Sequence, residues 1–450
     1  MNPRSAGGDG VALSGFATMS DTITHDASRG DGMNRVVFLL ALSVFINYID
    51  RSNLSIAAPL LKDELSLSDA QLGTLLSVFF WTYGCMQIPA GWLVDRFEVK
   101  WIFAAGFFVW SAATGVTAFL HGFSAWVVVR VILGIGESIS FPAYSKILGS
   151  GLFTESRRGF GNAAIMAGLS LGPAVGMLVG GSVVGRFGWR PFFLVLGVAS
   201  LLWLVPWLAW MPSGTTSTAP VSEPKVRILD IFRERSAWGT CLGQICINYG
   251  LYFLVAWLPF YLVRARNLSM NQMARVGGLI FLLAAVAAIL SGKLSDRWIA
   301  SGASATRVRK TLLGGGMTGL GVSLAAAAVA PDKVFVWALA VAGVCFGVNG
   351  AHCWAVTQTL AGPRVSGRWT GVQNFVGNFG GSFAPAVTGY LLNGLGQFYW
   401  PFLIAGVFSW IGALAWVFVV GPIEPVEWEK KIRGTQVGAG PSRATGGLSP

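Results

Sequence analysis

Long apolar segments recur along this chain, each of the length that a helix needs to cross a lipid bilayer. The hydrocarbon core is about 30 Å thick, which takes roughly 20 residues of helix. Only helices and closed barrels satisfy every backbone polar group inside a bilayer. The pattern therefore predicts an all-α membrane protein with twelve transmembrane helices. They lie at about 35–58, 70–93, 101–121, 124–147, 160–184, 189–211, 239–262, 273–297, 309–330, 333–359, 368–392 and 398–421.

The number and placement of charged residues also indicate a membrane protein. Of the 450 residues, 54% are apolar and only 12% are charged, a balance that a soluble domain of this size rarely has. Basic residues gather in alternate loops: residues 292–310 hold five, whereas 121–125 and 393–399 hold none. The positive-inside rule then places both termini in the cytoplasm. The net charge of +12 thus indicates topology, and nucleic-acid binding is not expected. We expect a multi-pass, monomeric protein of a cell membrane, assumed to be the bacterial inner membrane.

Polar segments predict the domain organisation. Residues 1–34 are rich in Gly, Ser, Thr and Asp and are expected to form a disordered cytoplasmic tail. Residues 212–238 cannot span a membrane and are expected to be a cytoplasmic linker between two six-helix bundles, 35–211 and 239–421. Residues 422–450 are expected to form a second cytoplasmic tail.

An internal repeat supports this division. The segment GWLVDRF at 91–97 recurs as GKLSDRW at 292–298, each time between the second and third helix of its half. Two similar bundles packed face to face form a midplane cavity whose access alternates as they rock. The motif's acids and arginines are candidate gating residues at the cytoplasmic rim, although they could equally well cap helices and anchor loops. They are Asp95, Arg96, Asp296 and Arg297.

No motif for enzymatic chemistry is found. The chain has no HExxH or phosphate-binding GxxxxGK[ST] sequence, and none of its five cysteines forms a CxxC pair. The one GxSxG match, GLSLG at 168–172, lies in an apolar predicted span and is better read as a helix-packing face than as a nucleophile motif. We therefore expect no catalytic residue, no metal site and no cofactor. A membrane enzyme or a sensor that does not transport is a poor match to a duplicated twelve-helix plan.

Four ionisable residues lie inside the predicted spans: Asp50 and Arg51 in the first, and Arg130 and Glu137 in the fourth. Each costs about 2.5 to 3.5 kcal/mol or more in lipid, so it is retained mainly where it lines a cavity or has a partner. Arg130 and Glu137 are nearly two turns apart and share a helix face, whereas neighbours such as Asp50 and Arg51 point about 100° apart. Ion pairs that only lock helices together seldom add stability, which favours a functional role.

The twelve helices, the two halves and the repeated Gly-x-x-x-Asp-Arg motif resemble the major facilitator superfamily. Within it, NYIDRSNLSIAAP, WTYGCMQIPAGWLVDR and RVILGIGESISFPA resemble the anion:cation symporter family, whose members carry organic anions and in many cases couple this to protons. The resemblance implies that Arg51 binds the substrate carboxylate, with Tyr48 and Tyr83 in the cavity. It also implies that Asp50 and Glu137 exchange protons and that Arg130 is their charge partner.

The same resemblance implies sugar-acid contacts in the second half, at Trp354 and Asn374. An aromatic face beside polar amides suits a polyol, and Gln373, Asn378 and His352 are nearby candidates. A lone intramembrane histidine could be a proton relay, but a packing role is favoured for His352.

These features together predict a secondary active transporter. We expect proton-coupled symport of an organic anion such as an aldonate, aldarate or hexuronate, by alternating access in the lipid bilayer. The alternative is a proton-antiporting exporter of drugs or other small molecules. That function would favour a cavity of unpaired acids and aromatics, which Arg51 argues against.

Overall fold

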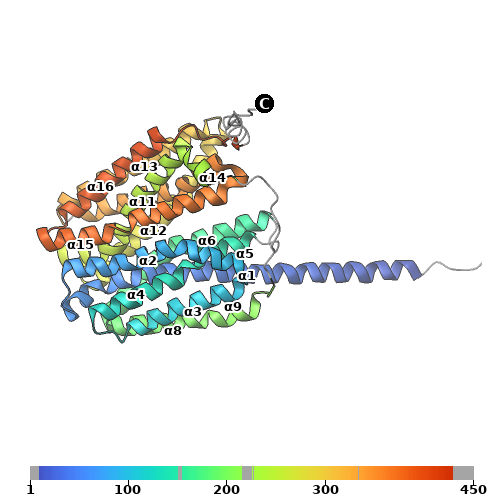
Figure 1. The fold of residues 1–450 in the computed structure, drawn as a ribbon, viewed down its shortest axis with the longest axis horizontal. Helices are drawn as coiled ribbons and strands as arrows, with labels where there is room; N and C mark the ends of the chain where they lie inside the picture. The colour runs from blue at the N-terminus through green and yellow to red at the C-terminus, as the bar shows by residue number, and fades with distance from the viewer. Residues whose placement is uncertain (1–9, 150–154, 215–225, 227, 333, 429–450) are drawn as a thin grey trace, which may run out of the picture. The chain divides into compact units, whose positions relative to one another are not determined.

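The computed structural model describes residues 10–149, 155–214, 226, 228–332 and 334–428, and all regular secondary structure within them is helical (Figure 1). Ten of these helices are long and apolar enough to cross a membrane. The remaining two predicted spans, 70–93 and 368–392, correspond to α2 (Asp69–Arg96), and to the end of α14 (Phe335–Gly381) with α15 (Ala384–Leu395). The all-α, multi-pass prediction is confirmed.

The chain divides into two compact units. The first contains residues 1–53 and 85–218, and the second contains residues 54–84 and 219–450. The division falls inside α1 (Gly10–Glu64) and α2, so the adjoining ends of these two helices belong with the C-terminal helices. The bundle boundary predicted at 212–238 remains a prediction.

Helix α1 begins at Gly10, upstream of the predicted start of the first span. The structure thus differs here from the disordered cytoplasmic tail that the composition predicts for residues 1–34. No proline occurs between Gly10 and Asn34, and an existing helix propagates at little cost where nothing interrupts it.

Close approach of helices characterises the first unit, where α3 packs against α4 and α8. A Cβ on Gly136 would lie 2.8 Å from the Trp110 backbone nitrogen and 2.9 Å from the Gly106 oxygen. Only glycine permits this spacing. Besides α1 and α2, its elements are α3 (Val99–Thr117), α4 (Phe123–Ser138), α5 (Ser140–Gly149), α6 (Glu155–Val175), η1 (Gly176–Gly180), α7 (Gly181–Phe187), α8 (Trp189–Leu202) and α9 (Leu204–Trp210).

In the second unit α14 packs against α11, α12 and α13. It joins two predicted spans, 333–359 and 368–392, across a kink at Gly362. That residue has φ of 67°, a left-handed conformation that glycine adopts without a steric penalty. The other elements are α10 (Ile228–Phe232), α11 (Arg235–Phe260), η2 (Tyr261–Ala265), α12 (Met270–Ala300), α13 (Ala305–Val329), α15, α16 (Tyr399–Leu414) and η3 (Ala415–Val419).

Candidate functional site

A buried ion pair joins α1 to α4 in the first unit. Arg51 Nε donates to Glu137 Oε2 at 3.2 Å, and the two side chains are 6% and 0% exposed. The Arg51 guanidinium also lies over the Tyr48 ring, 4.7 Å from its centroid. A cation over an aromatic face is attracted by the ring quadrupole. Tyr48 therefore helps to hold the guanidinium in place, while Glu137 occupies one of its hydrogen-bonding edges.

Asp50, which precedes Arg51 in the sequence, is also fully buried. Its Oδ1 accepts hydrogen bonds from Asn53 Nδ2 at 3.1 Å and from Thr114 Oγ1 of α3 at 3.2 Å. Its Oδ2 has no hydrogen-bond partner among the residues that the structure describes. Asp50 and Arg51 thus contact different helices, as the 100° rotation between neighbours predicts.

Arg130 completes the charged cluster. It is 3% exposed, and it interacts electrostatically with both Glu137 and Asp50. The cluster therefore contains two acids and two arginines, Asp50, Glu137, Arg51 and Arg130, whose formal charges sum to zero. Balanced charge is the condition under which ionised groups are tolerated in a low-dielectric interior.

Three polar residues next to this cluster were not predicted from the sequence: Asn47, Asn53 and Thr114. Asn47 is fully buried beside the Glu137 carboxyl, and Asn53 and Thr114 both bond to Asp50. The available signal was a polar residue within an apolar span. Because serine, threonine and asparagine side chains also hydrogen-bond between such helices for packing alone, that signal does not select these three.

The predicted sugar contacts fall in the second unit, on the two halves of α14. Gln373 is fully buried, and its amide is part of a chain of hydrogen bonds. Its Oε1 accepts from Thr357 Oγ1 at 2.5 Å, and its Nε2 donates to Gln244 Oε1 at 3.1 Å. Gln244 in turn donates to Asn248 Oδ1 at 3.0 Å. Both ends of the Gln373 amide are thus used within the bundle, and its role in substrate binding remains a prediction.

Asn374 and Trp354 are half-buried, so parts of their side chains remain accessible. Trp354 packs against a hydrophobic core cluster that includes Cys353 and Val356. Tyr83 also belongs to the second unit, where it is 2% exposed and stacks on Phe79 with ring centroids 5.9 Å apart.

His352 is also buried in α14, with 2% of its surface exposed. Its Nε2 has no hydrogen-bond partner among the described residues. It interacts with Arg309 and with Asp296, the acid of the repeated motif.

The candidate gating residues lie at helix ends. Arg96 is the last residue of α2, and Asp296 and Arg297 lie in the last turns of α12; all three are exposed. Arg96 also lies over the Trp92 ring. The Asp95 side chain lies outside the part of the chain whose side chains the structure describes. Gating by these residues remains a prediction.

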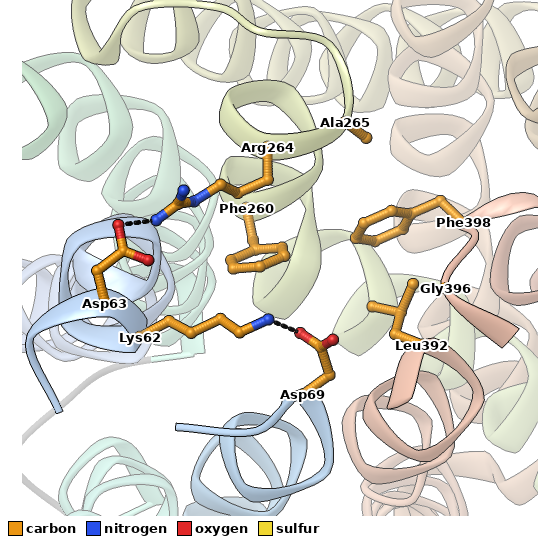
Figure 2. Close-up of a pocket in the computed structure, with 9 residues that line it drawn as sticks. All are labelled: Lys62, Asp63, Asp69, Phe260, Arg264, Ala265, Leu392, Gly396 and Phe398. Carbon is orange, nitrogen blue, oxygen red and sulfur yellow. Dashed lines mark hydrogen bonds and ion pairs between the residues drawn. The ribbon is translucent and has the colours of Figure 1, made fainter. Parts of the chain in front are cut away.

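A pocket of about 250 Å³ lies elsewhere in the second unit, where the end of α1 meets η2 and the turn after α15 (Figure 2). Lys62 pairs with Asp69 there, and Asp63 pairs with Arg264. Arg264 also donates to the Pro59 carbonyl at 2.7 Å. Since each of the two cations that line this pocket already has an acidic partner, the pocket presents no unbalanced charge to a ligand.

Known proteins with similar sequences are transporters. The model of the Major Facilitator Superfamily matches residues 40–385 and 299–444. A probable L-galactonate transporter of Escherichia coli is 30% identical over 412 residues, covering 85% of this chain and 88% of the relative. A probable galactarate/D-glucarate transporter of Bacillus subtilis is 30% identical over 441 residues, covering 88% and 93%.

The fold is also similar to that of a solved transporter. A bacterial homolog of the human lysosomal transporter Spinster, in an inward-facing and occupied conformation, aligns with a TM-score of 0.74. The alignment covers 85% of this chain and 96% of the homolog at 19% sequence identity. At that identity the similarity concerns the fold alone.

Proposed function

The chain belongs to the Major Facilitator Superfamily, and from that premise we propose that it is a proton-coupled symporter that takes up a small organic anion by alternating access. The proposed substrate is a sugar acid such as an aldonate, aldarate or hexuronate. The carboxylate would bind Arg51, and the polyol would contact Trp354 and Asn374. We further propose that the protein acts as a monomer with both termini in the cytoplasm.

The observation that carries this proposal is the buried Arg51–Glu137 pair beside Asp50. Arg51 is well suited to a carboxylate because a guanidinium donates two parallel hydrogen bonds to it. In this structure Glu137 accepts one of those bonds. A substrate anion must therefore compete with Glu137 for Arg51.

Charge balance couples that competition to protons. The four ionisable groups of the cluster sum to zero, so an entering anion adds a net negative charge to an apolar region. A proton on Glu137 or Asp50 cancels that charge and weakens the carboxylate's interaction with the arginines. Binding of the anion is then most favourable when a proton binds with it. Release of both on the cytoplasmic side restores the ion pairs, so an inward proton gradient drives uptake.

The relatives support the substrate class. Probable transporters of L-galactonate and of galactarate or D-glucarate have roughly the same length and align over most of this chain. The half-buried Asn374 and Trp354 offer the amide and the aromatic face that a polyol requires.

The test uses the purified protein in proteoliposomes with an acidic exterior. Labelled D-gluconate and D-glucarate should accumulate above the external concentration, and collapse of the pH gradient should abolish accumulation. Arg51→Lys keeps the charge but loses the planar fork, and should reduce uptake strongly. Efflux of a lipophilic cation under the same gradient, without accumulation of either sugar acid, would instead support the exporter and refute symport.

A further inference from the structure

A second hydrogen-bonded chain in the second unit ends on Asn374. The Tyr252 hydroxyl of α11 donates to Asn378 Oδ1. Asn378 Nδ2 donates to the Asn374 backbone oxygen at 2.7 Å and to Asn374 Oδ1 at 2.8 Å. Tyr252 and Asn378 are 4% and 6% exposed, whereas Asn374 is half-buried. These hydrogen bonds therefore connect a buried tyrosine to an accessible amide.

The chemistry of the partners determines which way both amides point. A backbone carbonyl can only accept, so the Asn378 atom beside the Asn374 carbonyl must be its NH₂ group. The same NH₂ donates its second proton to the Asn374 side chain, so the atom that it meets there must be Oδ1. The Asn374 NH₂ therefore faces away from Asn378. Among the described residues it makes no hydrogen bond.

Packing holds the tyrosine at the start of this chain. The Tyr252 ring stacks on Phe80 of α2, which belongs to the same unit, with centroids 4.1 Å apart and an interplanar angle of 24°. Helices α11 and α14 also approach closely, because a Cβ on Gly381 would lie 2.6 Å from the Asn248 Cβ. That approach lets the tyrosine hydroxyl reach across to α14.

We propose that Tyr252 and Asn378 are positioning residues that make Asn374 a hydrogen-bond donor to the substrate. This inference rests on the proposed function and adds to it a rule of selectivity. The group of the substrate that meets Asn374 must accept a hydrogen bond, as a hydroxyl or a carboxylate oxygen does. Without this relay of hydrogen bonds from Tyr252 through Asn378 to Asn374, the Asn374 amide can rotate, and the preference for a substrate group that accepts a hydrogen bond is lost.

The first test is a double-mutant cycle. The dissociation constant of D-gluconate is measured by calorimetry for the wild type, Tyr252→Phe, Asn374→Ala and the double variant. Loss of one hydrogen bond should weaken binding about threefold to tenfold in Tyr252→Phe. In the Asn374→Ala background the same change should have an effect of less than about twofold, because the amide that it orients is absent. Tyr249→Phe is the matched control. It removes the hydroxyl of a buried tyrosine in the same helix, and among the residues that the structure describes that hydroxyl makes no hydrogen bond.

The second test determines whether the Asn374 side chain donates a hydrogen bond to the substrate or accepts one. Monodeoxy and monodeoxyfluoro gluconates identify the hydroxyl whose removal matters in the wild type but not in Asn374→Ala. Fluorine at that position accepts weakly but cannot donate, so the wild type should bind the fluoro compound more tightly than the deoxy compound. Tyr252→Phe should bind the two compounds equally, which a merely structural role would not produce.

These experiments distinguish a wrong proposed function from a wrong role for Tyr252 and Asn378. If the wild type binds neither D-gluconate nor D-glucarate, the proposed function is refuted, and so is the role of the relay. If the wild type binds them but the effects of Tyr252→Phe and Asn374→Ala are additive, only the relay is overturned. Unchanged fluoro selectivity in Tyr252→Phe would also overturn it.

Discussion

Replacing Glu137 by glutamine should separate anion binding from proton coupling. The substitution keeps the size of the side chain and an oxygen that can accept the Arg51 hydrogen bond, but it removes the negative charge. At the observed 3.2 Å, the attraction between Arg51 and Glu137 is about 5 kcal/mol for an effective dielectric constant of 20. An anion that binds Arg51 in the wild type must overcome part of this attraction. In Glu137→Gln the ionic part of that competition is absent.

The expected result is tighter binding at alkaline pH. If about 1.4 kcal/mol of the competition is relieved, D-gluconate should bind Glu137→Gln tenfold more tightly than wild type at pH 8. Wild-type binding should weaken as the pH rises, because a deprotonated carboxylate competes for Arg51. Binding to the variant should vary much less. The variant should still exchange internal for external anion but should not accumulate it under a pH gradient.

Calorimetry and proteoliposome uptake measure these two properties separately. Asp230→Asn is the matched control, since Asp230 pairs with Arg233 at 3.1 Å outside the predicted spans, where ion pairs contribute little. That control should behave as wild type in both assays. Weaker binding of the anion by Glu137→Gln than by wild type at pH 8, or normal accumulation by the variant, would refute the competition between Glu137 and the substrate.

Three further outcomes are expected. Asp50→Asn keeps an oxygen for the Thr114 hydroxyl, so thermal unfolding should change little while proton-driven accumulation disappears; accumulation at the wild-type rate would contradict this. Asp63→Asn removes the carboxylate bound to Arg264, and because both side chains are substantially exposed, amide exchange in residues 59–69 should accelerate by no more than about fivefold. Gly136→Ala places a methyl group 2.8 Å from the Trp110 nitrogen and should destabilise the fold by about 1 to 3 kcal/mol. Gly91→Ala, where a Cβ meets no neighbour, should not lower the melting temperature, and equal melting of the two glycine variants would disprove the close packing at Gly136.

The fold class was readable from the sequence for a physical reason. Bilayer thickness imposes a local length and an apolar composition on each span, so hydropathy alone reports the helices. The repeated motif at 91–97 and 292–298 added the two-part plan, and the comparisons confirm the superfamily and the resemblance to sugar-acid transporters. The composition of residues 1–34 predicts a tail, whereas α1 extends back to Gly10, because a Gly- and Ser-rich composition does not prevent a neighbouring helix from continuing.

The candidate site could be predicted only as a set of charges. The cost of ionisable groups in lipid singled out Asp50, Arg51, Arg130 and Glu137, and that cost depends on each residue's own span. Their partners depend on how helices rotate and pack. Arg51 meets Glu137 across 86 residues of sequence, and Asp50 meets Thr114 across 64.

The side-chain amides of Asn374 and Gln373 likewise separate what the sequence predicts from what the tertiary structure decides. Sequence alone indicated that Asn374 and Gln373 are polar groups in an apolar span, but it could not distinguish their roles. Only the tertiary structure placed Gln373 within a buried hydrogen-bonded chain and left the Asn374 NH₂ available. Which lone pairs and protons remain for a ligand depends on the partners that neighbouring helices supply, and local sequence does not specify those partners.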